Sequence, residues 1–128
     1  MPERSADWMA QAERDLAAAE QLRATSYYEW AAFVAQQSGE KAVKAVYQRL
    51  HGEVRGHALL DLLQLLDDPT MTADVLDAAR RLDRYYIQAR YPDGFAAGTP
   101  QDYFTQEDAA SAVTDARTII AWGKRQVS

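Results

Sequence analysis

Apolar residues recur at spacings of three and four along most of the chain, which is the pattern of amphipathic helices. In residues 7–23 they are Trp8, Ala12, Leu16, Ala19 and Leu22. No stretch alternates apolar and polar side chains in the way that strands do, so we predict no strand. The same helical pattern continues in four further segments and predicts helices over residues 27–50, 57–68, 72–90 and 105–124.

Short local signals mark where these helices begin and end. Ser26 with Glu29, and Thr105 with Asp108, match the spacing of capping signals, in which a side chain pairs with free amides of the first turn. His51-Gly52 predicts a stop, because glycine takes the left-handed conformation that commonly ends a helix. Residues 91–104 hold two prolines, two glycines and four aromatic residues, and predict a loop packed on the body of the protein.

The predicted fold is all-α. It is an up-and-down antiparallel bundle of about five helices, with a long loop before the last helix. The length of 128 residues fits a single domain over residues 1–128. The segment 27–50 is apolar on more than one side, as expected for the central helix. Gly39 lies in its middle, where a glycine costs about 1 kcal/mol relative to alanine, and it therefore predicts the close approach of another backbone.

The middle of the predicted central helix also carries a polar belt. Gln36, Glu40 and Lys44 share one face, and Glu40 precedes Lys44 in the orientation that favours an ion pair. One interpretation is a solvated face. The other is a polar strip in a dimer or partner interface or beside a pocket, and the belt consists of Gln36, Gln37, Glu40, Lys41 and Lys44.

Composition narrows the chemistry. The absence of cysteine excludes disulfides, thiolate metal sites and a cysteine nucleophile, and only two histidines are present, so we expect no metal site and no cofactor. The net charge of −5 argues against a surface that binds nucleic acid non-specifically. The N-terminus lacks the apolar core of a signal peptide and no segment is apolar enough to span a bilayer, so we expect a cytoplasmic protein with no membrane partner.

Two places could bind an anion. His57 follows Gly56 at the predicted start of a helix, where it could act as a general base or hold a phosphate; the plainer interpretation is a packed or capping histidine. Residues 80–90 carry a local charge of +3, and the segment ends in Arg90-Tyr91-Pro92-Asp93. Arginine binds phosphate with two parallel hydrogen bonds and tyrosine stacks on bases, although Arg90 could equally cap its own helix.

These segments together resemble the HEPN family (higher eukaryotes and prokaryotes nucleotide-binding domain). The resemblance rests on Trp8 with residues 15–19, on 33–45 (FVAQQSGEKAVKA), on 56–63 (GHALLDLL), on 82–87 leading into 90–93, and on Ala109, Ala116 and Trp122. It implies a helical bundle that forms a homodimer and often works beside a minimal nucleotidyltransferase in a toxin–antitoxin-like pair. The Arg90-Tyr91-Pro92 motif resembles the branch that accompanies such a partner.

Many members of this family are metal-independent ribonucleases with four to six residues between an arginine and a histidine. Here one residue separates Arg55 from His57, and seven separate Arg49 from His57, so neither pair fits. The first hypothesis is therefore a non-catalytic, dimeric nucleotide-binding or partner module, whose ligand-binding residues are His57, Tyr85, Tyr86, Arg90, Tyr91 and Asp93.

Two alternatives remain open. One is an endoribonuclease toxin that acts on RNA, with His57 as general base and Arg90 or Arg55 stabilising the phosphate. The other is a dimeric scaffold without a ligand, in which the polar belt only sets the association.

Overall fold

The computed structural model describes residues 3–50 and 52–128, and within them the chain is helical, with no strand. The all-α prediction is thus confirmed. The elements are α1 (Ser5–Ala24), α2 (Tyr28–Leu50), α3 (Leu59–Leu65), α4 (Ala73–Asp83), α5 (Tyr85–Gln88), the 3-10 turn η1 (Pro92–Gly94), α6 (Pro100–Tyr103) and α7 (Gln106–Val127).

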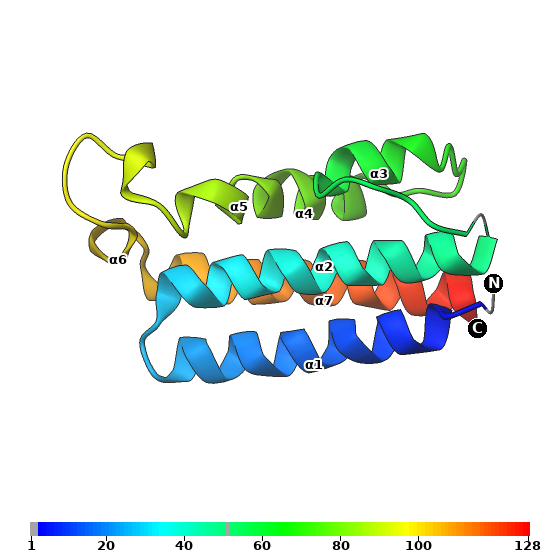
Figure 1. Ribbon diagram of the computed structural model, residues 1–128, viewed down its shortest axis with the longest axis horizontal. Coiled ribbons are helices and arrows are strands. Elements are labelled where there is room, and N and C mark those ends of the chain that lie inside the picture. Colours follow the sequence, from blue (N-terminus) through cyan, green and yellow to red (C-terminus); the bar gives the residue numbers. More distant parts are fainter. Residues whose placement is uncertain (1–2, 51) are drawn as a thin grey trace.

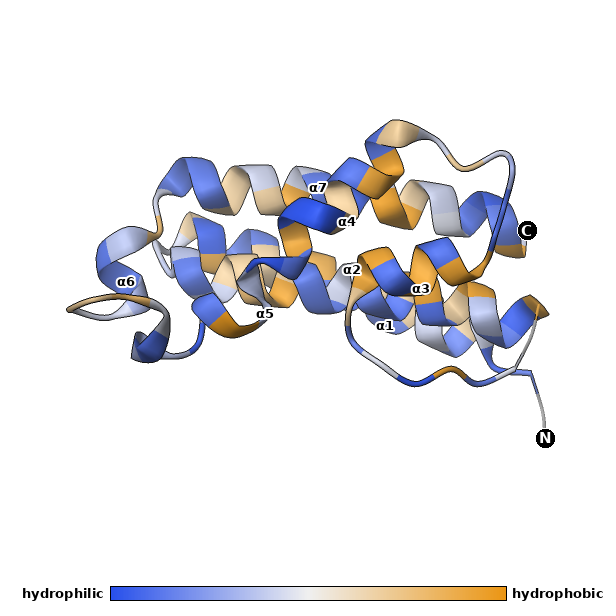
Figure 2. Cartoon of the chain, turned by 90° about the horizontal axis from the view of Figure 1, so that it is seen from above, coloured by the Kyte–Doolittle hydropathy of each residue, from blue (hydrophilic) through white to orange (hydrophobic). Residues whose placement is uncertain are grey.

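The three long helices α1, α2 and α7 lie side by side (Figure 1). Helices α3, α4 and α5 lie on the other side of α2 and α7 from α1, and α6 lies at the end of the molecule where α2 begins. We call the first group the long-helix bundle, and α3, α4, α5, η1 and α6 the short-helix layer. In Figure 2 hydrophobic residues dominate α3, which packs against α2 and α4. The central position predicted for residues 27–50 is confirmed, because α2 contacts both the bundle and the layer.

Small residues let the long helices approach closely. The hydroxyl of Ser38 on α2 donates to the backbone carbonyl of Ala12 on α1 at 2.7 Å. A methyl group built at Gly123 of α7 would lie 3.4 Å from the carbonyl oxygen of Ala42 on α2. The close backbone approach predicted at Gly39 therefore occurs at Gly123. Gly39 instead faces side chains, those of Leu59, Leu82 and Ile119.

The predicted helix ends are partly correct. Thr105 and Asp108 form the expected capping box at the start of α7, and Gly52 has a φ of +88°; His51 lies outside the described residues. The Ser26–Glu29 box is wrong, because Ser26 adopts a left-handed turn conformation with φ of 69° and α2 begins only at Tyr28.

The predicted helix over 72–90 is divided into α4 and α5. The division follows Asp83, whose carboxylate binds the first amides of α3. The helix also ends before Arg90, because the residue ahead of a proline disfavours helical angles and Tyr91 is extended at φ −128° and ψ 138°. The predicted 14-residue loop contains both η1 and α6, and α6 begins with a capping box at Thr99 and Asp102.

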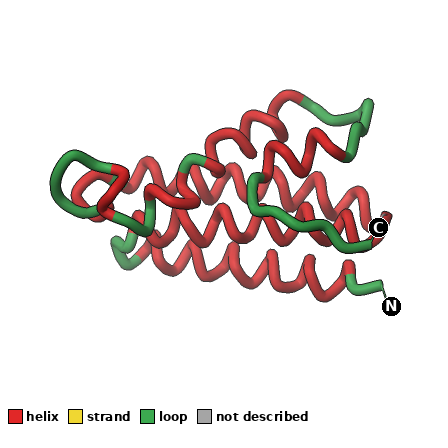
Figure 3. The backbone as a smooth tube through the Cα atoms, turned by 45° about the horizontal axis from the view of Figure 1, so that its top comes forward, coloured by secondary structure: helices red, strands yellow, loops and turns green. Residues whose placement is uncertain are grey.

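Residues 52–58 join α2 to α3 by running back along α2, as Figure 3 shows in green. We call this segment the return strap. It matters for the site because it carries His57 from the end of α2 back to the middle of that helix, where the polar belt lies.

Candidate functional site

His57 lies in the return strap, two residues before α3 begins, and not at a helix start as predicted. Its ring Nδ1 is 3.1 Å from Oε1 of Glu40. Its backbone carbonyl accepts a hydrogen bond of 3.0 Å from the buried amide of Gln36. The side chain is still 57% exposed. The belt thus holds the histidine by two contacts while its ring remains open to solvent.

Glu40 connects this histidine to a lysine. Its side chain is only 7% exposed, and its second oxygen, Oε2, lies 3.1 Å from Nζ of Lys44. A buried carboxylate needs a partner of opposite charge, and Lys44 supplies that charge to Glu40. The other ring nitrogen of His57, Nε2, forms no hydrogen bond within the described residues.

Tyr86 on α5 brings His57 and Arg90 together. The imidazole stacks on the Tyr86 ring with centroids 5.2 Å apart and planes 16° apart. The guanidinium carbon of Arg90 lies 4.6 Å from the same ring centroid. Arg90 also lies 4.6 Å from the ring of Phe33 and 5.0 Å from that of Tyr91. These are cation–π distances, and they place an imidazole and a guanidinium around one aromatic ring.

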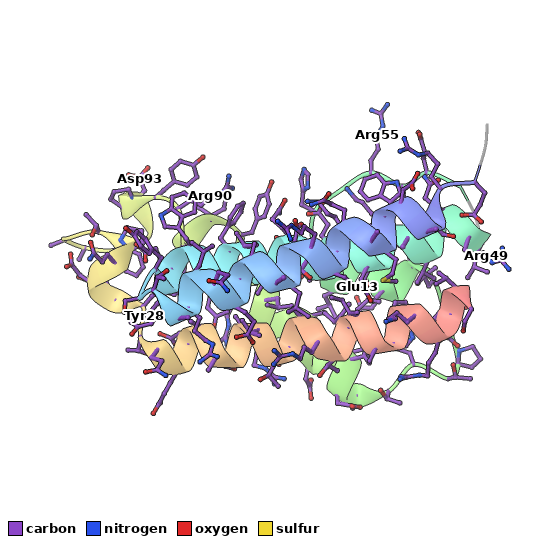
Figure 4. The ribbon with its side chains drawn as sticks, turned by 90° about the horizontal axis from the view of Figure 1, so that it is seen from below. Glu13, Tyr28, Arg49, Arg55, Arg90 and Asp93 are labelled. Atoms are coloured by element: carbon purple, nitrogen blue, oxygen red, sulfur yellow. The ribbon has the colours of Figure 1, made fainter. Side chains whose placement is uncertain are left out.

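The aromatic contacts continue along α2. Trp30 meets Phe33 edge-on with centroids 6.1 Å apart, and Phe33 lies 6.1 Å from Tyr86. We call Trp30, Phe33, Tyr86, Tyr91 and Arg90 the aromatic cluster. A hollow of about 270 Å³ opens beside it, lined by Trp30, Arg90 and residues 99–101 among others. Figure 4 shows Arg90 at this end of the molecule.

The structure brings together four of the six residues predicted to bind a ligand: His57, Tyr86, Arg90 and Tyr91. Tyr85 points elsewhere and packs against Phe104 with centroids 5.4 Å apart, and burial raises the pKa of its hydroxyl. Asp93 lies exposed on η1, near Arg90 in Figure 4, and forms no hydrogen bond or ion pair within residues 3–50 and 52–128.

Arg90 also caps its own helix, as the plainer interpretation predicted. Its Nε donates to the carbonyl of Tyr86 at 2.8 Å. Since a guanidinium carries five N–H groups, this bond fixes the orientation of the guanidinium and still leaves N–H donors for a ligand.

The polar belt serves mainly the chain itself. Gln36 is fully buried and Glu40 nearly so, and Lys41 pairs with Asp15 on α1. Buried side chains have no surface to offer a second protein. The interface predicted from the sequence is therefore reduced to the half-buried members Gln37, Lys41 and Lys44, and for these it stays a prediction.

Two polar arrangements were missed in the sequence. Asp83 accepts hydrogen bonds from the amides of Leu59 at 2.8 Å and Leu60 at 3.0 Å, and so fixes the end of the return strap. Burial raises the pKa of this carboxyl, although the two amides act to lower it. Arg81 forms two hydrogen bonds of 2.9 Å to Asp115, which joins α4 to α7.

A signal for the second arrangement was present. Asp115 comes three residues after Ala112 and four before Ile119, so it shares a helix face with two apolar residues. An acid in that position needs a partner. Asp83 gave no comparable signal, because its neighbours in the sequence are arginines, among which an acid is expected on an exposed surface.

Neither a cluster of metal-ligating side chains nor a membrane-spanning helix occurs in the described ranges. No three His, Asp or Glu side chains gather there to hold a metal ion. None of the helices in those ranges is long and apolar enough to cross a bilayer.

Comparison with known proteins identifies the family. Among solved structures, TT1696 from Thermus thermophilus shares 35% identity at a TM-score of 0.91, covering 98% of this chain and 99% of its own. ST0689, an archaeal HEPN homologue, shares 39% identity at a TM-score of 0.84 and covers 99% of this chain and 100% of its own. The HEPN domain protein tm0613 from Thermotoga maritima shares 30% identity at a TM-score of 0.73 and covers 93% of this chain and 95% of its own.

No curated protein matches this chain. The HEPN domain model, in contrast, matches residues 5–127, which is almost the whole sequence. The resemblance seen in the sequence is therefore confirmed, and the chain belongs to the HEPN domain family.

Proposed function

We propose that this protein is a nucleotide-binding HEPN module, dimeric and cytoplasmic, that works with a minimal nucleotidyltransferase. One observation carries the proposal: His57 and Arg90 both contact the ring of Tyr86. A nucleotide combines an anionic phosphate with a flat base. The guanidinium suits the first and the half-exposed aromatic rings suit the second.

The order of the contacts supports a preformed site. Arg90 is fixed by the Tyr86 carbonyl, and His57 by Glu40 and Gln36. Side chains already held in place lose less freedom when a ligand binds, and this improves affinity. The hollow beside Arg90 offers space for a phosphate group or a small base next to these donors.

Calorimetric titration with AMP and with ATP tests the proposal. Arg90→Met keeps the apolar stem and removes the guanidinium, and we expect affinity to fall by about tenfold or more, as for loss of a charged hydrogen-bond partner. Arg84→Met is the matched control, because Arg84 is exposed next to α5 and forms no ion pair within the described ranges. We expect the control to bind within about twofold of wild type.

The result would contradict the proposal in two ways. One is that neither nucleotide binds the purified wild-type protein, and the other is that the two arginine variants lose affinity equally. Equal loss would mean that only the overall charge of the segment matters and that the arrangement around Tyr86 does not.

The dimer and the partner enzyme come from family membership, and each has its own test. Sedimentation at two protein concentrations measures the mass of the wild type and of Gln37→Glu, which adds a charge to the accessible edge of the belt. We expect a dimer for the wild type and dissociation for the variant. Purification of the tagged chain from its native host, followed by mass spectrometry, tests for a co-purifying nucleotidyltransferase; its absence would count against the partner.

One geometric feature favours a second function, RNA cleavage. A carboxylate that holds one nitrogen of an exposed imidazole is the arrangement of an oriented general base, and Glu40 with His57 has it. Total RNA incubated with wild type and with His57→Ala discriminates the two functions. Cleavage that disappears in the variant would establish the enzyme, whereas equal background in both would exclude His57 as its base.

A further inference from the structure

A further cleft among the described residues lies away from the aromatic cluster. Its volume is about 920 Å³, and its walls come from the start of α1, the second half of α2 and the return strap: Arg4, Trp8, Lys44, Gln48, Val54 and Arg55. This volume is at the upper end of the range for small-molecule pockets. Figure 4 shows Arg55 far along the molecule from Arg90, so the cleft is a separate place.

The cleft has an aromatic wall. Trp8 is half-buried there, and Nζ of Lys44 lies 6.0 Å from the centre of its ring. Val54 of the return strap is also half-buried and belongs to the same lining. A second hollow, of about 570 Å³, borders Trp8 and Arg4 on the side of Lys41. The indole therefore presents flat apolar surface to a cleft, which suits an aromatic ring.

The charges of the cleft are mostly paired already. Arg4 pairs with Asp7 at 3.0 Å and Lys44 with Glu40 at 3.1 Å. Glu3 pairs with Arg49 at 3.5 Å. Within residues 3–50 and 52–128, this leaves two lining residues, Glu53 and Arg55, with no ion pair. Both are exposed on the return strap, two positions apart, and they are opposite in sign.

We propose that this cleft binds a small aromatic anion, with its ring against Trp8 and its acidic group toward Arg55. The guanidinium is the cation here that no protein carboxylate occupies, and it binds a carboxylate or phosphate by two parallel hydrogen bonds. Glu53 repels the same anion and so limits the cleft to ligands of low charge. The cleft is distinct from the site proposed around Tyr86, since neither His57 nor Arg90 lines it.

The three tryptophans lie in different parts of the molecule, so their signals show where a ligand binds. Trp8 reports on the cleft, Trp30 on the aromatic cluster, and Trp122 is buried in the core. The indole N–H signals of the ¹⁵N-labelled protein are followed while 1-naphthoate is added. We expect the Trp8 signal to shift to saturation while the Trp30 and Trp122 signals stay in place. Naphthalene-1-methanol, the neutral counterpart, is expected to bind several-fold more weakly.

Two exposed variants test the charges without loss of fold. Arg55→Gln removes the proposed anion partner, and we expect about two- to fivefold weaker binding of 1-naphthoate; Glu53→Gln removes the repulsion, and we expect tighter binding of similar size, as for exposed charge pairs. The proposal is overturned if the Trp8 signal does not move, or if Trp30 responds instead. It is also overturned if the two variants leave the affinity unchanged or move it in the same direction.

Discussion

The long-helix bundle and the short-helix layer are held together by different means. In α1, α2 and α7, small residues bring the backbones close, as at Ala12 with Ser38 and at Gly123 with Ala42. In the layer, the helices are short, and individual polar contacts, such as those of Asp83 with α3 and of Arg81 with α7, add to the buried apolar side chains. The candidate site lies where the two meet. Helix α2 of the bundle contributes Glu40 and Phe33 to this site, whereas the return strap and the layer bring His57 and Tyr86 to them.

The largest expected effect comes from the apolar contact between the two regions. Leu82 of α4 is fully buried and its Cδ1 is close to Gly39 of α2. Leu82→Ala leaves a cavity at this contact, and we expect the free energy of unfolding to fall by about 2–5 kcal/mol in urea denaturation. Leu65→Ala is the control, because Leu65 of α3 is 72% exposed. A loss of similar size in both variants would mean that the layer is not anchored at Leu82.

Filling the same contact from the other side should also destabilise the protein. A methyl group at Gly39 would lie 3.2 Å from Leu59, 3.3 Å from Leu82 and 3.4 Å from Ile119. Gly39→Val places a larger group there, and we expect a loss of about 1–3 kcal/mol by overpacking. Unchanged stability in the same urea experiment would show that α3, α4 and α7 can shift to accommodate the larger side chain, and that the bundle and the layer are not tightly packed at Gly39.

The third effect concerns the ion pair that joins α4 to α7. Asp115 is almost buried, at 7% exposed, and Arg81 is its partner. Arg81→Gln leaves this carboxylate without its cation, and we expect a loss of roughly 1–2 kcal/mol. Its neighbour Arg80 pairs with the exposed Asp77, so Arg80→Gln should cost under about 0.5 kcal/mol. Equal costs at the two arginines would indicate that Asp115 finds another partner or water.

The sequence was sufficient for the bundle and insufficient for the layer. In the predicted helix over 105–124, the apolar residues Ala109, Val113, Ala116 and Ile120 recur at spacings of four and three, and all four are buried. Such a pattern is reliable because a long helix repeats its period many times. The layer depends on single long-range contacts. Nothing in the spacing of His57 and Glu40 shows that the return strap runs back along α2, yet that course creates their contact.

The candidate site was predicted in part for the same reason. Tyr86, Arg90 and Tyr91 are close together in the sequence, so their proximity could be expected from the sequence alone. Phe33 contacts Arg90 from another helix, α2, and the spacing of residues in the sequence does not reveal such a contact. The orientation of Tyr85 toward Phe104 depends on the course of residues 91–104, which the loop prediction left undefined.

The smallest expected effect is the change in stability caused by Asp83→Asn, which is measured as a function of pH. Burial raises the pKa of this carboxyl above its ordinary value of 3.8, so the folded state favours the protonated form. As pH rises through this range, ionisation costs the wild type stability that Asp83→Asn does not lose. The asparagine keeps one acceptor and leaves one amide of α3 unpaired, so we expect it to be roughly 1 kcal/mol less stable in acid. The deficit should shrink in urea denaturation from about pH 3.5 to about pH 6.5. A deficit that grows with pH would mean that the amides of Leu59 and Leu60 outweigh burial, and that the layer depends on the charge of Asp83.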